Sequence, residues 1–148
     1  MLLVPSLAGA LPAAALPPVR TQDFVNFETP HVAPLALTPD GTRLLAVNTP
    51  DGVLEVLDVT GPRPAPVLAV PVGVDPVTVR ARTNDEAWVV NHVSDSISVV
   101  DLRTGHVSAT LQTSDEPYDV VFAGTPERAY VSCSQGNEVL VFDPSDVG

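Results

Sequence analysis

Acidic side chains are the groups in this chain best suited to chemistry, because carboxylate oxygens bind divalent cations and attract basic partners. The sequence holds 18 Asp and Glu residues against 7 basic residues, and its formal net charge is −11. One set of acids falls at the same end of the strands expected below, and we call this set the acidic face: Glu28, Asp51, Asp75, Asp95, Asp115 and Glu116. One hypothesis is that the acidic face binds a protein partner or a cation such as Ca²⁺, although the Asp-x-Asp spacing of calcium loops is absent. The other is that these residues are ordinary solvated loop acids.

The basic residues show the opposite placement. All seven are Arg, and every one after Arg20 is expected on or beside the turns at the other end of the strands: Arg43, Arg63, Arg80, Arg82, Arg103 and Arg128. Two further acids, Asp119 and Glu138, are assigned to the acidic end. The sequence therefore predicts one end that is purely acidic and one end of mixed charge.

Histidine and cysteine show no catalytic or metal-binding spacing. His31 and His92 are expected in loops at the acidic end, whereas His106 is expected to begin a strand at the other end. A zinc-type site needs at least three convergent ligands, and a His-x-x-x-His pair is absent. Cys133 is the sole cysteine, so an intrachain disulfide and a Cys-x-x-Cys-His haem attachment are excluded. Serine-hydrolase, phosphate-loop and dinucleotide motifs are also absent, so we expect no catalytic residue and no cofactor within this chain.

A repeat of 41 to 43 residues organises the chain. Three similar segments close on aspartates that lie 43 and 42 residues apart: Leu54-Glu-Val-Leu-Asp58, Ile97-Ser-Val-Val-Asp101 and Val139-Leu-Val-Phe-Asp143. Prolines recur upstream of them at intervals of 42 and 41 residues: Pro34, Pro76 and Pro117. A residue that recurs in every copy usually serves the repeated unit, so we interpret the three aspartates as turn residues that accept backbone N–H bonds.

Each copy resolves into short strands separated by turn signals. The strands are expected at 35–37, 43–48, 53–58 and 66–72, at 77–81, 87–91, 96–101 and 106–112, and at 118–122, 128–133 and 138–143. Four antiparallel strands in 40 to 45 residues make the blade of a β-propeller. The sequence thus predicts an all-β fold with three four-stranded antiparallel blades, at about 31–73, 74–113 and 114–148, the last without its fourth strand.

The same frame leaves one strand-like segment, Phe24-Val-Asn-Phe27, at the position of a fourth strand ahead of the first blade. Propellers have about four to eight blades. We therefore expect the partial propeller of residues 20–148 to belong to a ring of about seven blades, completed by further blades of the same polypeptide.

Residues 1–19 are small and apolar, with Pro12-Ala-Ala-Ala15 as a candidate cleavage site, which fits a truncated signal peptide or a linker. A signal peptide predicts a secreted, periplasmic or cell-surface protein. The negative net charge argues against nucleic-acid partners and against anionic membrane surfaces. The prolines and the short apolar run argue against membrane insertion by this segment.

The repeats resemble a known family. Pro34-Leu-Ala-Leu-Thr-Pro-Asp-Gly-Thr-Arg-Leu-Leu-Ala-Val-Asn48 is similar to the propeller repeat named for its Tyr-Val-Thr-Asn (YVTN) signature. Trp88-Val-Val-Asn91 and Tyr130-Val-Ser-Cys133 occupy the signature position, and Val99-Val-Asp-Leu-Arg-Thr-Gly105 resembles the segment that follows it. The resemblance covers about residues 24–143 and implies an exported propeller related to surface-layer and amine-dehydrogenase-like proteins. It implies no fixed catalytic residue.

Two functional hypotheses follow. The first is an exported, non-catalytic β-propeller segment that acts as a binding or structural scaffold. The alternative is the N-terminal part of a larger propeller oxidoreductase, amine-dehydrogenase-like or haem-linked, whose cofactor residues lie outside this segment.

Overall fold

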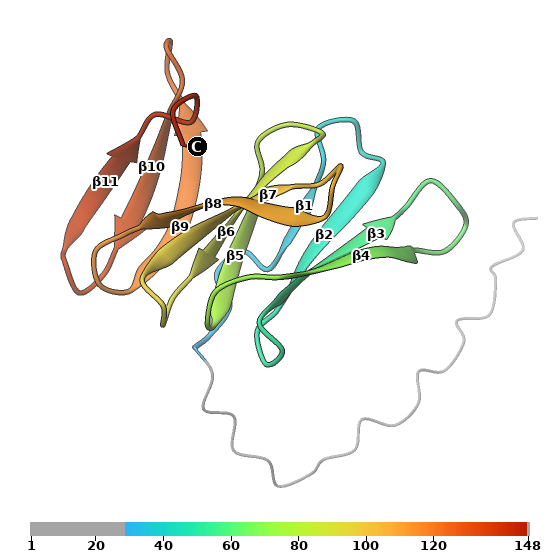
Figure 1. Cartoon of the computed structure of the whole chain (residues 1–148), viewed down its shortest axis with the longest axis horizontal. Coiled ribbons are helices and arrows are strands. Elements are labelled where there is room, and N and C mark those ends of the chain that lie inside the picture. Colours follow the sequence, from blue (N-terminus) through green and yellow to red (C-terminus); the bar gives the residue numbers. More distant parts are fainter. Residues whose placement is uncertain (1–28, 148) are drawn as a thin grey trace, which may run out of the picture.

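The computed structural model describes residues 29–147, and in that part of the chain eleven strands form three antiparallel sheets without a helix (Figure 1). Blade 1 has the order β1-β2-β3-β4, with β1 at Leu35–Leu37, β2 at Arg43–Asn48, β3 at Val53–Asp58 and β4 at Ala65–Pro71. Blade 2 has the order β5-β6-β7-β8, with β5 at Pro76–Ala81, β6 at Glu86–Asn91, β7 at Ser96–Asp101 and β8 at His106–Gln112. Blade 3 has the order β9-β10-β11, with β9 at Pro117–Ala123, β10 at Arg128–Cys133 and β11 at Glu138–Phe142.

These boundaries confirm the predicted fold class. Every strand expected from the sequence forms, with ends that differ by at most one residue, and the third sheet has three strands. Pro76 and Pro117 begin the first strands of their blades, and Pro34 lies directly before β1. No helix in the described residues is long and apolar enough to cross a membrane.

Local sequence explains the hairpins between the second and third strands of each blade. The residue that precedes the third strand has a left-handed backbone in all three copies: Gly52 (φ 63°), Asp95 (φ 47°) and Asn137 (φ 50°). Glycine adopts this conformation freely, and Asp and Asn tolerate it better than other side chains. The residue type at this position therefore differs between the three copies, while the backbone conformation of the turn is the same.

Alternation along the strands places apolar side chains on both faces of the middle sheet. On β7, Ile97 and Val99 pack toward blade 3, whereas Val100 packs toward blade 1. Two hydrophobic clusters result, one between blades 1 and 2 and one between blades 2 and 3. The three blades thus lie side by side in an arc, each interface being a sheet-on-sheet contact (Figure 1).

The interface between blades 2 and 3 is built around Trp88, whose side chain is fully buried. Its ring meets that of Phe122 edge to face, with the centroids 5.2 Å apart. Its indole N–H donates to Oε1 of Glu86 at 2.8 Å, so the one polar atom of the side chain is satisfied. An edge-to-face pair adds about 0.5–1.5 kcal/mol to the stabilisation from burial.

Candidate functional site

The acidic face is made by loops that antiparallel pairing brings to one end of the arc. These are the connections β2–β3, β4–β5, β6–β7 and β8–β9. Asp51 and Asp75 line one hollow of about 370 Å³, between the β2–β3 and β4–β5 loops. Asp95, Asp115 and Glu116 line a second hollow of about 200 Å³, together with His92 and Val93. Glu28, the remaining member of the set, lies outside the described residues.

The carboxylates of the acidic face hold the loops that carry them. Asp95 Oδ1 accepts the backbone N–H of Glu116 at 3.0 Å, which ties the β6–β7 hairpin to the start of the next blade. Asp75 Oδ2 accepts the N–H of Thr29 at 3.3 Å, and Asp51 Oδ2 accepts from the Asn48 amide at 2.9 Å. Glu116 Oε2 accepts from the hydroxyl of Ser134 at 2.9 Å, and the carboxylate of Glu138 likewise accepts from Ser114.

Two of these acids also have a left-handed backbone conformation. Asp75 and Glu116 each precede the proline that opens the next blade, and both have positive φ, at 60° and 55°. A non-glycine residue in this conformation is held there by its surroundings. Among residues 29–147, no three His, Cys, Asp or Glu side chains lie close enough together to hold a metal ion.

Two of the three histidines serve contacts between blades. His31 Nε2 lies 2.6 Å from Thr49 Oγ1, and that hydroxyl donates to the Pro76 carbonyl at 2.7 Å. His92 occupies the position of Thr49 in the next repeat, and its Nδ1 lies 3.2 Å from the Pro117 carbonyl. Since a carbonyl accepts hydrogen bonds, Nδ1 of His92 is the donor in this contact. In blades 1 and 2, the residue after the second strand, Thr49 or His92, therefore hydrogen-bonds to the proline that opens the next blade.

His92 is almost completely buried and packs against the Tyr118 ring at a centroid distance of 4.6 Å. His106 begins β8 and is exposed at the other end of the arc. The structure thus separates the histidines, as the sequence predicts, and gives two of them interface contacts that the sequence did not reveal.

At the opposite end, arginines pair with acids across the blade boundaries. Arg43 Nη2 lies 3.5 Å from Asp85 Oδ1, and Arg43 also donates to the Leu102 carbonyl at 3.1 Å. Arg82 Nε donates to Glu127 Oε2 at 2.8 Å, which joins blade 2 to blade 3. These side chains are partly exposed, so each pair contributes about 1 kcal/mol or less.

Asp119 lies near the acidic end, where strand order places it, because its register partner Ser132 is the last residue but one of β10. Its carboxylate makes a two-point ion pair with Arg80, with Oδ1 at 3.1 Å from Nε and Oδ2 at 2.8 Å from Nη2. Both residues lie within the first strands of their blades, so the pair joins β5 to β9. The sequence did not reveal this ion pair, because strand order assigns a residue to an end but says nothing of how far an Arg side chain reaches.

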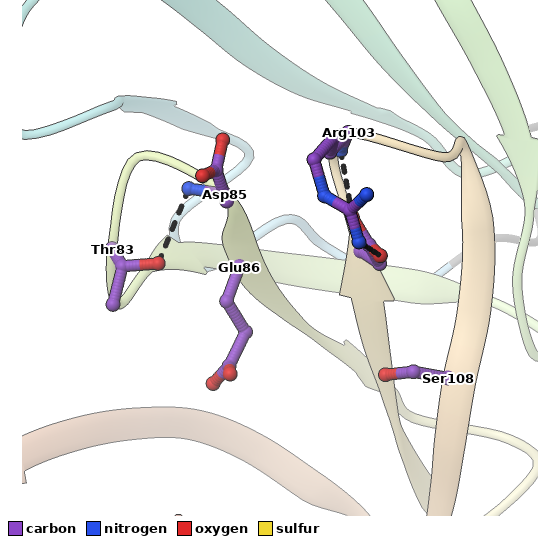
Figure 2. A pocket seen from close by; sticks show the side chains of 6 residues that line it. Thr83, Asp85, Glu86, Arg103 and Ser108 are labelled. Carbon is purple, nitrogen blue, oxygen red and sulfur yellow. Dashed lines mark hydrogen bonds and ion pairs between the residues drawn. The ribbon is translucent and has the colours of Figure 1, made fainter.

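A polar hollow of about 290 Å³ lies at the arginine-bearing end. Figure 2 shows its lining, in which the Thr83 hydroxyl accepts the N–H of Asp85 at 3.1 Å and Arg103 turns back onto Asp101. Arg103 Nη2 lies 3.2 Å from Asp101 Oδ2, and its side chain is 72% exposed. The remaining polar groups are also engaged, because Glu86 Oε1 accepts from Arg82 and Trp88 and the Ser108 hydroxyl donates to the Val99 carbonyl.

The repeated aspartates are turn residues, as predicted. Asp58 Oδ1 accepts from the hydroxyl and the N–H of Thr60, and Asp143 Oδ1 accepts from the same two groups of Ser145. Asp101 Oδ1 accepts the N–H groups of Arg103 and Thr104. These hydrogen bonds favour the ionised carboxylate and lower the pKa of all three aspartates.

Cys133 is a buried thiol on β10, and burial raises its pKa above the ordinary value. A thiol is the weaker nucleophile in its protonated form, so this environment is that of a structural cysteine.

Comparison with known proteins supports the fold and leaves the activity open. No protein-family model matches the chain, and no curated protein matches it. Among solved structures, Kuenenia stuttgartiensis hydrazine synthase matches with a TM-score of 0.70 at 22% identity, over 87% of this chain and 37% of that one. A candidate 6-phosphogluconolactonase from Bacteroides uniformis matches with a TM-score of 0.65 at 16% identity, over 81% of this chain and 39% of that one.

A candidate 6-phosphogluconolactonase from Bacteroides fragilis matches at 0.60 and 15% identity, over 74% of this chain and 33% of that one. This chain therefore spans well under half the length of these structures. At such identities the similarity shows the fold, which is that of β-propeller blades.

Proposed function

We propose that this chain is an exported propeller scaffold of the YVTN-repeat type whose acidic face receives a basic partner segment. The observation that carries the proposal is the division of charge between the two ends of the arc. Asp51, Asp75, Asp95, Asp115 and Glu116 all belong to loops at one end. No ion pair formed among residues 29–147 reaches these five acids, because the arginines pair instead with Asp85, Glu86, Asp101, Asp119, Glu127 and Asp143.

Electrostatics favours a polycationic partner over a single ion. A negative surface without neutralising Arg attracts positive charge over about a Debye length, about 8 Å at physiological ionic strength. The acids are spread over two hollows, and Asp51, Asp75, Asp95 and Glu116 already accept hydrogen bonds from the loops. A flexible basic segment can contact both hollows at once, whereas one Ca²⁺ ion requires six to eight oxygens around a single point.

The test uses a decalysine peptide as the probe and isothermal titration as the measurement. The variant Asp51→Asn with Asp115→Asn removes one charge from each hollow, and we expect it to weaken decalysine binding several-fold. The matched control, Asp85→Asn with Asp146→Asn, removes two charges from elsewhere and is expected to bind as the wild type does. Equal loss in both double variants, or no binding at low salt, would remove the basis for the proposal. A rise in melting temperature with millimolar Ca²⁺ would instead favour the cation, since a ligand of the native state stabilises it.

A second candidate is a segment of a larger propeller enzyme, with its cofactor residues outside this segment. The observation in its favour is that the matched structures include an enzyme, hydrazine synthase, and are more than twice the length that this chain covers. Mass spectrometry of the native polypeptide discriminates the two candidates. A native chain of several hundred residues that carries a bound chromophore would favour the enzyme, and a native chain of this length would exclude it.

A further inference from the structure

Two exposed valines belong to the acidic face. Val74 lies in the β4–β5 loop and Val93 lies in the β6–β7 loop, and each is 60% exposed. Val74 lines the hollow of Asp51 and Asp75, and Val93 lines the hollow of Asp95. We call Val74 and Val93 the valine pair. Each hollow of the acidic face therefore combines acids with one exposed aliphatic side chain.

Backbone hydrogen bonds join the two loops at the valine pair. The N–H of Val93 donates to the Val74 carbonyl at 3.3 Å, and the N–H of His92 donates to the Asp75 carbonyl at 2.9 Å. The N–H of Val74 donates to Ser94 Oγ at 3.0 Å. The two valines therefore lie side by side, with one hollow belonging to each.

Close packing at Gly73 fixes the loop that carries Val74. The N–H of Gly73 donates to Oδ1 of Asn91 at 3.1 Å, and Asn91 is fully buried. A Cβ at position 73 would lie 2.5 Å from Ser94 Oγ, so glycine is the residue that lets the two loops approach this closely. A surface that is already ordered loses less conformational freedom when a partner binds. The valine pair is therefore preorganised for binding.

The repeat shows that the fold does not require valine at either position. At the boundary between blades 2 and 3, Asp115 stands at the position of Val74 and Gln135 at the position of Val93. That boundary keeps the backbone hydrogen bond of the residue after the second strand, at 3.0 Å. Polar residues are therefore compatible with this junction, and a structural role does not explain an aliphatic pair that faces water.

The charges around the valine pair define the chemistry of its partner. Asp75 directly follows Val74, and Asp95 follows Val93 by two residues, so acids flank the pair on both sides. An apolar centre inside a polar rim is the usual arrangement of a protein-binding surface. A second copy of this chain would bring the same negative charge, and an anionic membrane surface would be repelled likewise. The complementary partner therefore carries positive charge on both sides of an apolar centre.

We propose that the valine pair binds the centre of a peptide segment in which large aliphatic side chains lie between two groups of basic residues. This proposal rests on the proposed function and specifies the chemistry of the partner that the acidic face receives. The aliphatic side chains pack on Val74 and Val93, while the basic groups lie over the two hollows. Burial of apolar surface then adds affinity that salt does not screen, whereas salt weakens the attraction between the charges.

Isothermal titration of the full chain with two peptides of equal length and charge tests the proposal. Each peptide has four lysines, two central residues and four more lysines, and the central residues are Leu-Leu in the leucine peptide and Ser-Ser in the serine peptide. Decalysine is the third probe.

The valine-pair variant is Val74→Ser with Val93→Ser. The matched control is Val67→Ser with Val121→Ser, because both of these valines are exposed and neither lines the two hollows. Val74→Thr with Val93→Thr is the milder second variant, should the first lose its sheet signal in circular dichroism, since threonine keeps the branched shape of valine.

We expect the wild type and the matched control to bind the leucine peptide about tenfold more tightly than the serine peptide, a difference of about 1.4 kcal/mol. The valine-pair variant should bind the two peptides equally and keep the wild-type affinity for decalysine. Added salt should weaken the binding of all three peptides while the preference for leucine persists.

Decalysine binding without a preference for the leucine peptide would overturn this proposal and leave the proposed function in place. A preference that the valine-pair variant keeps, or that the matched control loses equally, would also overturn it, because the leucines would then bind elsewhere. A preference that depends on the valine pair, in a protein that does not bind decalysine, would support the pair and overturn the proposed function. Failure of all three peptides to bind would overturn both.

Discussion

Replacing one repeated valine in each blade by alanine measures how much each face is buried. Val56, Val99 and Val141 occupy the same position of β3, β7 and β11 and are chemically identical. Val56 and Val99 are at most 1% exposed, whereas Val141 is 57% exposed. The series Val56→Ala, Val99→Ala and Val141→Ala therefore varies the surroundings and holds the deleted atoms constant.

The expected magnitudes follow from burial. Val→Ala removes two methyl-sized groups, each contributing about 0.8 kcal/mol when buried, and a closed interface adds a cavity penalty. We expect Val56→Ala and Val99→Ala each to lower the free energy of unfolding by about 2–3 kcal/mol. At Val141 less than half of that area is buried and no closed cavity forms, so about 0.5–1 kcal/mol remains, including the lower strand preference of alanine.

Urea unfolding followed by fluorescence is the assay, since Trp88 is the only tryptophan and lies in the interface between blades 2 and 3. A urea dependence of about 1–3 kcal/mol per molar puts the midpoint shift near 1 M for Val56→Ala and Val99→Ala, and a few tenths of that for Val141→Ala. Equal costs at all three positions would refute the assignment of Val141 to an uncovered face.

Three further predictions concern charges and the thiol. The folded state lowers the pKa of Asp58, Asp101 and Asp143 below the ordinary 3.8, so the stability they contribute is present above about pH 4 and is lost as the pH falls through the lowered values. Asp58→Ala should therefore cost more stability at pH 7 than near pH 2, and equal costs at both would contradict this. A double-mutant cycle of Arg80→Met and Asp119→Asn in urea should give a coupling of about 1 kcal/mol that shrinks in high salt, whereas a coupling of zero would mean that the pair is not formed in solution. Cys133 should react with a disulfide reagent slowly in the native protein at pH 8 and rapidly in urea, and fast native reaction would show that β10 is open.

The repeat was readable from sequence because it is local. Strands of three to seven residues are bounded by turns that contain residues such as Gly41 and Thr104, and each blade repeats the same order within 41 to 43 residues. The role of Asp58 as a turn acceptor was likewise visible, because its partner Thr60 lies two residues away. The left-handed conformation of Asp95 could have been predicted from its alignment with Gly52.

Contacts between blades were not readable from one sequence. Arg80 and Asp119 are 39 residues apart, and Thr49 meets Pro76 across 27 residues, so no turn pattern or alternation links them. The exposure of Val141 depends on whether another blade lies against it, and Val141 has the same position in the repeat as the buried Val99. The placement of the acidic loops followed from strand order alone, whereas the hydrogen bonds that engage Asp75 and Asp95 required the structure.

The most direct test of the repeated interface is amide hydrogen exchange of β7 and β11. Exchange reports the opening of each strand, and covered strands open least. We predict that Ser96–Asp101 exchanges slowly, because blades lie on both of its faces, and that Glu138–Phe142, which is covered on one face, exchanges faster. Equal protection of the two strands would contradict a repeated interface that buries both faces of blade 2 and one face of blade 3.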